Sequence, residues 1–202
     1  MKKVLYICLV CLLMVVPLSG CQNSGNNYVF ETLSVTLDGE KTLNFDMNQE
    51  EVRTVMGEEP SETETKEEAK RIDDEWESFS LSVEYFVDSP YEVAELQVSL
   101  PSNTQFETSF GIAKGDSAAS VKEKLGEICM TKEIDSGVSY SYGLLYADGK
   151  YQIVDYNKSF DELIGDHEDA KVYLVNFSCV DDKVAAFYIL DAFGDFQKAH
   201  QE

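Results

Sequence analysis

The sequence predicts an α+β protein of two tandem units, each a short helical segment packed on an antiparallel β-sheet. Three observations lead to this prediction. Apolar and polar residues alternate along several segments, as they do in strands with one buried face. Two short amphipathic segments begin at a capping residue and end at glycine, as helices do. The second of these segments repeats the first, so the two sheets are expected to be related and to join into one curved sheet.

The first twenty residues have the layout of a signal peptide. Two lysines precede an uninterrupted apolar stretch over residues 4–16, which is too short to span a bilayer comfortably. The small residues Ser19 and Gly20 then stand directly before Cys21. This layout predicts that residues 1–20 are removed, whereas the alternative is an uncleaved membrane anchor.

The four residues Leu18-Ser19-Gly20-Cys21 resemble the lipobox of bacterial lipoproteins. The resemblance implies a diacylglycerol on the sulfur of Cys21 and acylation of the new amino terminus, with palmitate as the expected acyl chain. Each buried lipid methylene contributes about 0.8 kcal/mol, so two or more chains hold a protein stably on a membrane. We therefore expect a lipid-anchored protein on the extracytoplasmic face of the cell membrane. The small polar residues of segment 21–27 form a tether.

The chain is strongly acidic, with a formal net charge of −22. Loss of two lysines with the signal peptide makes the mature chain two units more negative. Nucleic acid needs a positively charged footprint, so no nucleic-acid partner is expected. An anionic bilayer surface repels such a chain, so the lipid on Cys21 makes the membrane contact. The charge either attracts a cationic partner or only keeps the protein soluble, and the second explanation is favoured.

The first unit is assigned to residues 28–100. Alternation over residues 29–37 predicts a strand, and an Asp-Gly turn leads into a second strand over 41–45. A helix begins after Asn48 and ends at Gly57. The alternating segments 79–87 and 94–100 predict two further strands.

An acidic stretch over residues 58–77 separates that helix from the following strand. It has little apolar periodicity and is interpreted as an exposed, solvated loop. Trp76 is the only tryptophan of the chain and borders this stretch. It is therefore the candidate for an exposed binding anchor.

The second unit is assigned to residues 101–202. A helix begins after Ser117 and ends at Gly126. The predicted strands cover residues 138–146, 150–156, 171–180 and 183–190. A short helix capped by Ser159 is predicted over 159–164, and the residues from 194 onward are interpreted as a loose tail.

The two units are related by an internal repeat. Five pairs share one offset of 69 residues: Leu43 with Ile112, Asn48 with Ser117, Val52 with Val121, Met56 with Leu125, and Gly57 with Gly126. Chance similarity between capped helices is the alternative explanation. The order of strands after each helix favours a duplication.

The pattern Gly115-Asp116-Ser117…Val121…Leu125-Gly126, echoed by Asn48…Val52…Met56-Gly57…Pro60, resembles two known groups. It is similar to the tandem-repeat fold of the β-lactamase inhibitor proteins and to the SmpA/OmlA small outer-membrane lipoproteins. The resemblance implies two helix-plus-sheet units joined into one curved sheet and a non-catalytic role in protein binding.

The inhibitory activity of that family is not expected to carry over. The alternation assigns Phe79, Leu81, Val83 and Tyr85, and likewise Val138, Tyr140, Tyr142 and Leu144, to the covered face of the sheet. The open face then receives Ser78, Ser80, Ser82, Ser139 and Ser141. Serine is a poor anchor for a protein interface, where Trp, Tyr and Arg dominate the binding energy.

No motif in the sequence indicates an enzyme. A nucleophile elbow, a phosphate-binding glycine loop and a dinucleotide fingerprint are all missing from the sequence. His167 lies among acidic residues without a second histidine or cysteine at ligand spacing, so no metal or cofactor is expected. Cys129 and Cys179 either form a disulfide or remain two separate buried thiols. A cluster of tyrosines over residues 140–156 is interpreted mainly as core, with a sugar-stacking or protein-binding patch as the alternative.

These observations lead to two hypotheses of function. The first is a non-enzymatic binding or scaffold module that acts on another envelope or secreted protein. The second is an envelope solute receptor or enzyme whose site is assembled only in the fold. A rigid patch without a deep pocket favours the first, and a concave pocket with converging polar groups favours the second.

Overall fold

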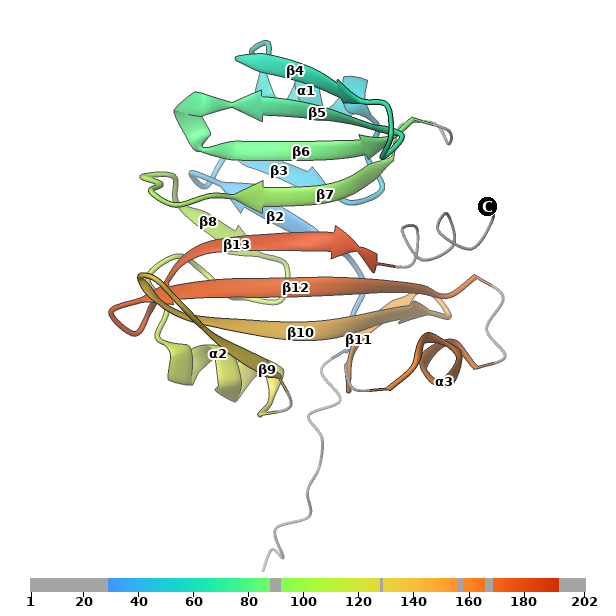
Figure 1. The fold of residues 1–202 in the computed structure, drawn as a ribbon, viewed down its shortest axis with the longest axis vertical. Coiled ribbons are helices and arrows are strands. Elements are labelled where there is room, and N and C mark those ends of the chain that lie inside the picture. The colour runs from blue at the N-terminus through green and yellow to red at the C-terminus, as the bar shows by residue number, and fades with distance from the viewer. Residues whose placement is uncertain (1–28, 88–91, 128, 156–157, 166–168, 193–202) are drawn as a thin grey trace, which may run out of the picture.

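A computed structural model describes residues 29–87, 92–127, 129–155, 158–165 and 169–192 (Figure 1). The predicted signal peptide, the predicted tether, Cys21, His167 and the predicted tail from residue 194 onward lie outside these residues. In chain order the strands are β1 (Val29–Phe30), β2 (Ser34–Leu37), β3 (Lys41–Asn44), β4 (Glu62–Lys66), β5 (Arg71–Trp76), β6 (Leu81–Phe86), β7 (Val93–Val98), β8 (Phe106–Thr108), β9 (Met130–Ile134), β10 (Gly137–Ala147), β11 (Lys150–Val154), β12 (Lys171–Val180) and β13 (Lys183–Asp191). The helices are α1 (Gln49–Met56), α2 (Ala118–Leu125) and α3 (Phe160–Ile164), with a 3-10 turn η1 (Glu77–Phe79).

The α+β class predicted from the sequence is wrong, because the protein is mostly β. Strands make up 53% of the structure and helices only 15%. The difference comes from polar segments without clear alternation, which form β4, β5, β8 and β9. These segments become strands because neighbouring strands complete their backbone hydrogen bonds, which local sequence does not reveal.

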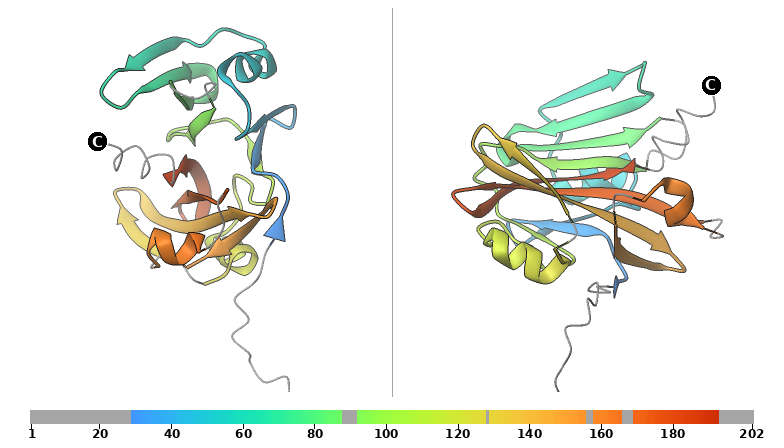
Figure 2. Two further views of the ribbon diagram at one scale, coloured as in Figure 1. Left: turned by 90° about the vertical axis from the view of Figure 1, so that its right-hand side faces the viewer. Right: turned by 60° about the horizontal axis from the view of Figure 1, so that its bottom comes forward.

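The strands form two antiparallel sheets. The ten-stranded sheet has the order β1-β11-β10-β12-β13-β7-β6-β5-β4, with β9 also paired to β10, and the three-stranded sheet has the order β3-β2-β8. The core lies between them and is closed by α1 and α2. The other face of the large sheet is covered at one end by α3, which packs on Leu145 and Val172. The rest of this face is concave, because β4 and β5 at one side and the β9–β10 hairpin at the other reach further forward than β13 between them (Figure 2).

The predicted helices after Asn48 and Ser117 are confirmed with matching bounds, and the short helix predicted over 159–164 is α3. Helix α1 lies between Asn48, whose side chain accepts a hydrogen bond from the Glu51 N–H, and Gly57. Helix α2 lies between Ser117 and Gly126. Each helix directs apolar side chains into the core, where Val52, Met56, Val121 and Leu125 are buried. The capping residues therefore define both helices as the sequence predicts.

A four-stranded meander follows each of these helices. The first is β4-β5-β6-β7 and the second is β9-β10-β12-β13, with β11 and α3 inserted between β10 and β12. The two meanders meet through their last strands, where Phe187 pairs with Val98 and Ile189 pairs with Leu96. The hydrogen-bonded ladder is therefore continuous across the predicted unit boundary.

The acidic stretch is a second correction, since most of it forms the β4–β5 hairpin rather than a loop. Like-charged side chains face each other across the hairpin, with Lys66 across from Arg71 and Glu64 across from Asp73, and their charge is balanced diagonally because Lys66 Nζ lies 3.0 Å from Asp73. On β5 the inward positions carry Ile72, Asp74 and Trp76. A polar residue at the middle inward position hides the apolar alternation that would have revealed the strand.

Candidate functional site

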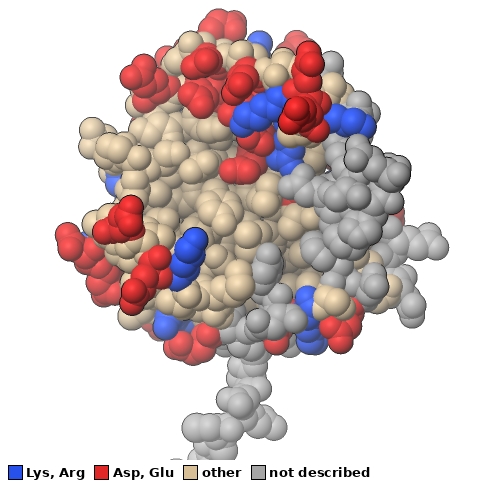
Figure 3. Space-filling view, viewed as in Figure 1, with Lys and Arg blue, Asp and Glu red and all other residues tan. Residues whose placement is uncertain are grey.

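One candidate site is the part of the concave face of the large sheet that α3 does not cover, which we call the open face. It is formed by outward side chains of the two meanders: Asp73, Ser82, Glu84, Glu95, Gln97, Ala186, Tyr188, Leu190, Leu174, Asn176, Ser178, Ser139 and Ser141. Charged side chains gather along its upper edge and at its lower left, with a broad uncharged area between them (Figure 3). The open face therefore has a neutral middle and a charged border.

A row of uncharged side chains crosses the middle of the open face. The strand register aligns Ser82 with Gln97, Gln97 with Tyr188, Tyr188 with Asn176, and Asn176 with Ser141. Beside Tyr188 on the same face, Leu190 pairs with Leu174. These side chains are half-buried, except Asn176 and Ser141, which are buried. The row joins the two meanders into one surface.

Asn176 holds two of the predicted open-face serines in place. Its Nδ2 donates hydrogen bonds to Ser139 Oγ and, over 2.7 Å, to Ser141 Oγ. Ser82 also lies on this face, as expected, and donates to Asp73 Oδ1 over 2.7 Å.

Ser78 and Ser80 do not lie on the open face as the sequence suggested, because η1 interrupts the alternation before β6. The prediction also missed Tyr188, Leu174 and Leu190. Their alternation with the inward residues of β12 and β13 was the signal available in the sequence.

The upper border of the open face is a ladder of paired charges. Lys66 contacts Glu84 and lies 3.0 Å from Asp73, and Arg71 lies 3.0 Å from Glu84. Burial works against the charged form of Lys66, but its hydrogen bonds to Glu84 and Asp73 outweigh burial and raise its pKa. Burial, and next the charge of Glu84, raise the pKa of Glu95 at the lower end of the ladder. The ladder therefore neutralises most of its own charge next to the uncharged row.

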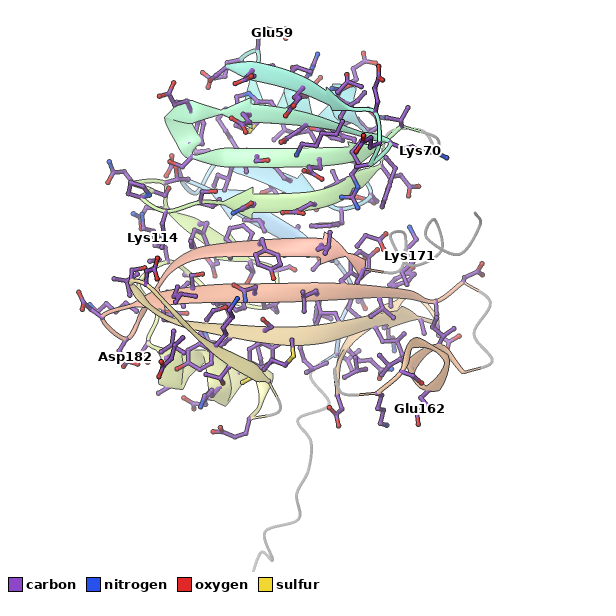
Figure 4. The ribbon with its side chains drawn as sticks, viewed as in Figure 1. Glu59, Lys70, Lys114, Glu162, Lys171 and Asp182 are labelled. Carbon is purple, nitrogen blue, oxygen red and sulfur yellow. The ribbon has the colours of Figure 1, made fainter. Side chains whose placement is uncertain are left out.

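A separate hollow lies where one end of the large sheet meets the small sheet, and we call it the tyrosine pocket. It has a volume of about 270 Å³ and is lined by Glu31, Thr32, Leu33, Asn44, Phe45, Asp46, Glu92, Tyr146, Tyr151, Lys171 and Tyr173. Lys171 marks its position at the start of β12 (Figure 4). The pocket and the open face are formed by different side chains.

The aromatic rings of the pocket pack against one another. The ring centres of Tyr146 and Tyr151 are 4.7 Å apart, and those of Tyr151 and Tyr173 are 5.7 Å apart. Phe45 meets Tyr173 edge-on at 5.6 Å. Burial raises the pKa of Tyr151 to about 12, so at neutral pH its hydroxyl is protonated and able to donate a hydrogen bond.

Trp76 is not an exposed anchor, and this prediction is wrong. Its side chain is 0% exposed, and its indole N–H donates to the backbone oxygen of Glu58 over 3.2 Å. Trp76 pairs with Leu81 across β5 and β6, and both side chains face the core. The indole therefore closes the upper end of the core instead of contacting a partner.

Cys129 and Cys179 are both free thiols, so the structure contains no disulfide between them. Cys179 is buried in the core, and burial raises the pKa of its thiol to about 11. Cys129 is only half-buried. Of the two interpretations left open by the sequence, the structure agrees with separate thiols.

Asp74 is a buried carboxylate that the sequence analysis did not single out. It is fully buried and accepts four hydrogen bonds, two from Arg53 at 2.7 and 2.8 Å, one from Thr63 at 2.7 Å and one from Gln49 at 3.0 Å. Burial alone would raise its pKa, but the hydrogen bonds from Arg53 and Thr63 lower it. Since these donors occupy both oxygens, Asp74 ties α1 to the sheet and is not placed to react with a substrate.

Within the described residues, no group of three or more His, Cys, Asp or Glu side chains is arranged to hold a metal ion. No helix in the described part of the chain has the length and apolar character needed to cross a membrane. Comparison with protein-family models, with curated proteins and with solved structures finds no match to this chain. The resemblance to the β-lactamase inhibitor proteins and to the SmpA/OmlA lipoproteins therefore remains a prediction.

Proposed function

We propose that this protein is a lipid-anchored binding or scaffold protein of the extracytoplasmic membrane face, and that its open face contacts another envelope or secreted protein. One observation carries the proposal: the uncharged row crosses the junction of the two meanders and is bordered by charges. Protein interfaces combine a centre depleted of charge with a polar rim, and the open face has this arrangement.

Tyr188 is the candidate anchor of the interface. It lies in the middle of the row, next to Leu190 and Leu174 and between Gln97 and Asn176. Tyrosine is enriched among the residues that dominate binding energy, because it combines a large apolar ring with a hydrogen-bonding hydroxyl. Leucine side chains beside it add apolar area, and the amides of Gln97 and Asn176 add hydrogen-bonding groups.

The strands that carry the row keep it ordered before a partner binds. All five residues of the row lie in paired strands, and Asn176 is held by hydrogen bonds to serines. A surface that is already ordered loses less conformational entropy when a partner binds. The open face is therefore suited to a protein partner that presents a complementary convex surface.

The partner contact is tested by site-specific photo-crosslinking on intact cells. A photoreactive residue is placed at Tyr188 or at Gln97, with Thr54 on the exposed side of α1 as the matched control. We expect the same cross-linked protein from the first two positions and none from Thr54. Identical products from all three positions, or none from Tyr188 and Gln97, would contradict the proposal.

The membrane attachment is tested separately. The Cys21→Ser variant removes the acceptor of the lipid. We expect the unaltered protein to partition into the detergent phase and the variant to stay in the aqueous phase. Detergent partitioning by the variant would show that lipid on Cys21 is not the anchor.

A further inference from the structure

The tyrosine pocket is unused by the proposed contact on the open face. Its walls come from segments far apart in the chain: the residues after β1, the end of β3, β10 and β11, the residue before β7, and the start of β12. Such convergence of separate elements on one hollow is typical of ligand sites. An inference about this pocket does not depend on the partner proposed for the open face.

The inner wall of the pocket is aromatic. Among its lining residues, Tyr173 and Phe45 are buried, and Tyr146 and Tyr151 are half-buried. Tyr151 also stacks on Phe30, with ring centres 5.2 Å apart and an angle of 10° between the planes. These contacts fix the rings in place, so the wall is formed before any ligand arrives.

The rim of the pocket is negatively charged. Its charged residues are Glu31, Asp46, Glu92 and Lys171. Lys171 Nζ lies 3.4 Å from Glu92 Oε2, and this pair cancels its own charge. For Glu31 and Asp46 the structure records no ion pair with another described residue, so two carboxylates remain to act on a ligand.

An aromatic wall combined with uncompensated carboxylates selects the charge of the ligand. The negative face of a tyrosine ring attracts cations, by about 0.5–2 kcal/mol depending on how far the site is desolvated. The carboxylates add attraction for a cation and repel an anion. We infer that the tyrosine pocket binds a small organic ammonium ion. The volume of about 270 Å³ lies just below the usual range for drug-sized ligands, so the ammonium group carries only short substituents.

The inference is tested with choline and its uncharged carbon analogue, 3,3-dimethylbutan-1-ol. The two molecules have nearly the same shape and differ in the charge of the central atom. Binding to the purified protein is followed by titration calorimetry and by NMR of the ligand methyl groups. We expect saturable binding of choline that is at least about tenfold tighter than binding of the alcohol, since cation–π and carboxylate contacts act only on the charged molecule.

Variants assign the binding to this pocket. Asp46→Asn and Glu31→Gln change exposed side chains, so the fold is preserved, and each should weaken choline binding about threefold or more. Tyr151→Leu should weaken it further. Glu64→Gln removes a carboxylate on β4 that is also exposed, and it serves as the control that leaves binding unchanged. Thermal unfolding of each variant shows whether the fold is intact, and the two rim variants decide the question if Tyr151→Leu does not fold.

Three results would overturn the inference. The first is equal affinity for choline and for the alcohol, which would mean that the pocket selects ligands by apolar shape and not by charge. The second is saturable binding of glucose without binding of choline, which would make the wall a sugar-stacking surface. The third is no saturable binding of choline, or binding that Asp46→Asn and Glu64→Gln weaken equally.

Discussion

Asp74 places a carboxylate in the protein interior, where hydrogen bonds and an ion pair stabilise its charge. A buried charge costs much free energy unless it is paired and hydrogen-bonded. Arg53 from α1 supplies the pair, and Thr63 and Gln49 supply the remaining donors. The residue that hides β5 in the sequence is thus the one that attaches α1 to the large sheet.

We expect Asp74→Asn to lower the free energy of unfolding by about 2 kcal/mol at neutral pH, because charge-assisted hydrogen bonds are lost. Folding lowers the pKa of Asp74, so its contribution is complete above the unfolded pKa of about 3.9 and is lost as the pH falls through the lower folded value. Urea unfolding should show a constant difference from wild type between about pH 5 and 8 and a shrinking one below about pH 4.

The control for this measurement is Glu62→Gln on the exposed edge strand β4, which should change stability by less than about 0.5 kcal/mol. A difference between wild type and Asp74→Asn that does not shrink in acid would contradict the role given to the carboxylate.

Tyr85, unlike Asp74, has a buried polar group without a hydrogen-bond partner in the described part of the chain. Its hydroxyl is buried and has no hydrogen-bond partner among the described residues. Removing an unsatisfied buried hydroxyl relieves a desolvation cost, so Tyr85→Phe should raise the free energy of unfolding by about 1 kcal/mol. Tyr142→Phe is the matched comparison, because the Tyr142 hydroxyl donates to the backbone oxygen of Gly126 over 3.2 Å. That variant should lower stability, and a loss of stability in Tyr85→Phe would mean that the hydroxyl has a partner in solution.

At the scale of elements, α1 and α2 are both eight residues long, and each begins after a polar capping residue and ends before a glycine. Their final glycines differ in conformation. Gly57 has φ 71° and ψ 8°, in the left-handed region, whereas Gly126 has φ 97° and ψ 171°. The second conformation is almost restricted to glycine, while the first is also tolerated by asparagine.

Gly126→Ala should therefore destabilise the protein more than Gly57→Ala, for which about 1 kcal/mol is expected. No atom lies within 4 Å of a Cβ added at Gly126, so the cost comes from the backbone rather than from a clash. Chemical denaturation of both variants checks the order. Gly57→Asn should lose less stability than Gly57→Ala, and equal losses in all three would contradict the assigned conformations.

The helices and the long strands were predictable because their signals are local. Asn48 and Ser117 cap their own helices through bonds to residues three positions away. The alternation of Leu81 and Val83 on β6, and of Tyr142 and Leu144 on β10, placed these side chains in the core, where the structure finds them. The polar strands β4 and β9 carry no such signal, because exposed positions dominate them.

At the scale of the whole molecule, the pairing of β7 with β13 determines whether the two meanders unfold together. Phe187, Ile189, Val98 and Leu96 are buried on both sides of this junction. A continuous sheet with a shared core should unfold in one cooperative transition.

Ile189→Ala tests this cooperativity. Removing a buried isoleucine costs about 3 kcal/mol. Trp76 is the only tryptophan and lies in the first meander, whereas Ile189 lies in the second. We expect the urea midpoint of Trp76 fluorescence to fall as far as the midpoint of far-ultraviolet circular dichroism. A shift in circular dichroism alone would show that the two meanders unfold independently.

The candidate surfaces depend on the same long-range pairing. The uncharged row of the open face exists only because Gln97 and Tyr188 become neighbours across β7 and β13. Glu31, Asp46, Tyr151 and Lys171 come from distant segments to form the tyrosine pocket. Sequence spacing contains no signal for either arrangement.

By itself the sequence determined the caps of α1 and α2, the core side of the long strands, and the hairpin turn after Leu37, all of which depend on neighbours a few residues away. The lipid anchor at Cys21 likewise remains a sequence-based proposal. Only the tertiary structure decided the mostly β class, the burial of Trp76, the β4–β5 hairpin, and the two candidate surfaces. The physical reason is that a strand is completed by hydrogen bonds and side-chain contacts from a partner strand, and the partner is chosen by the whole fold.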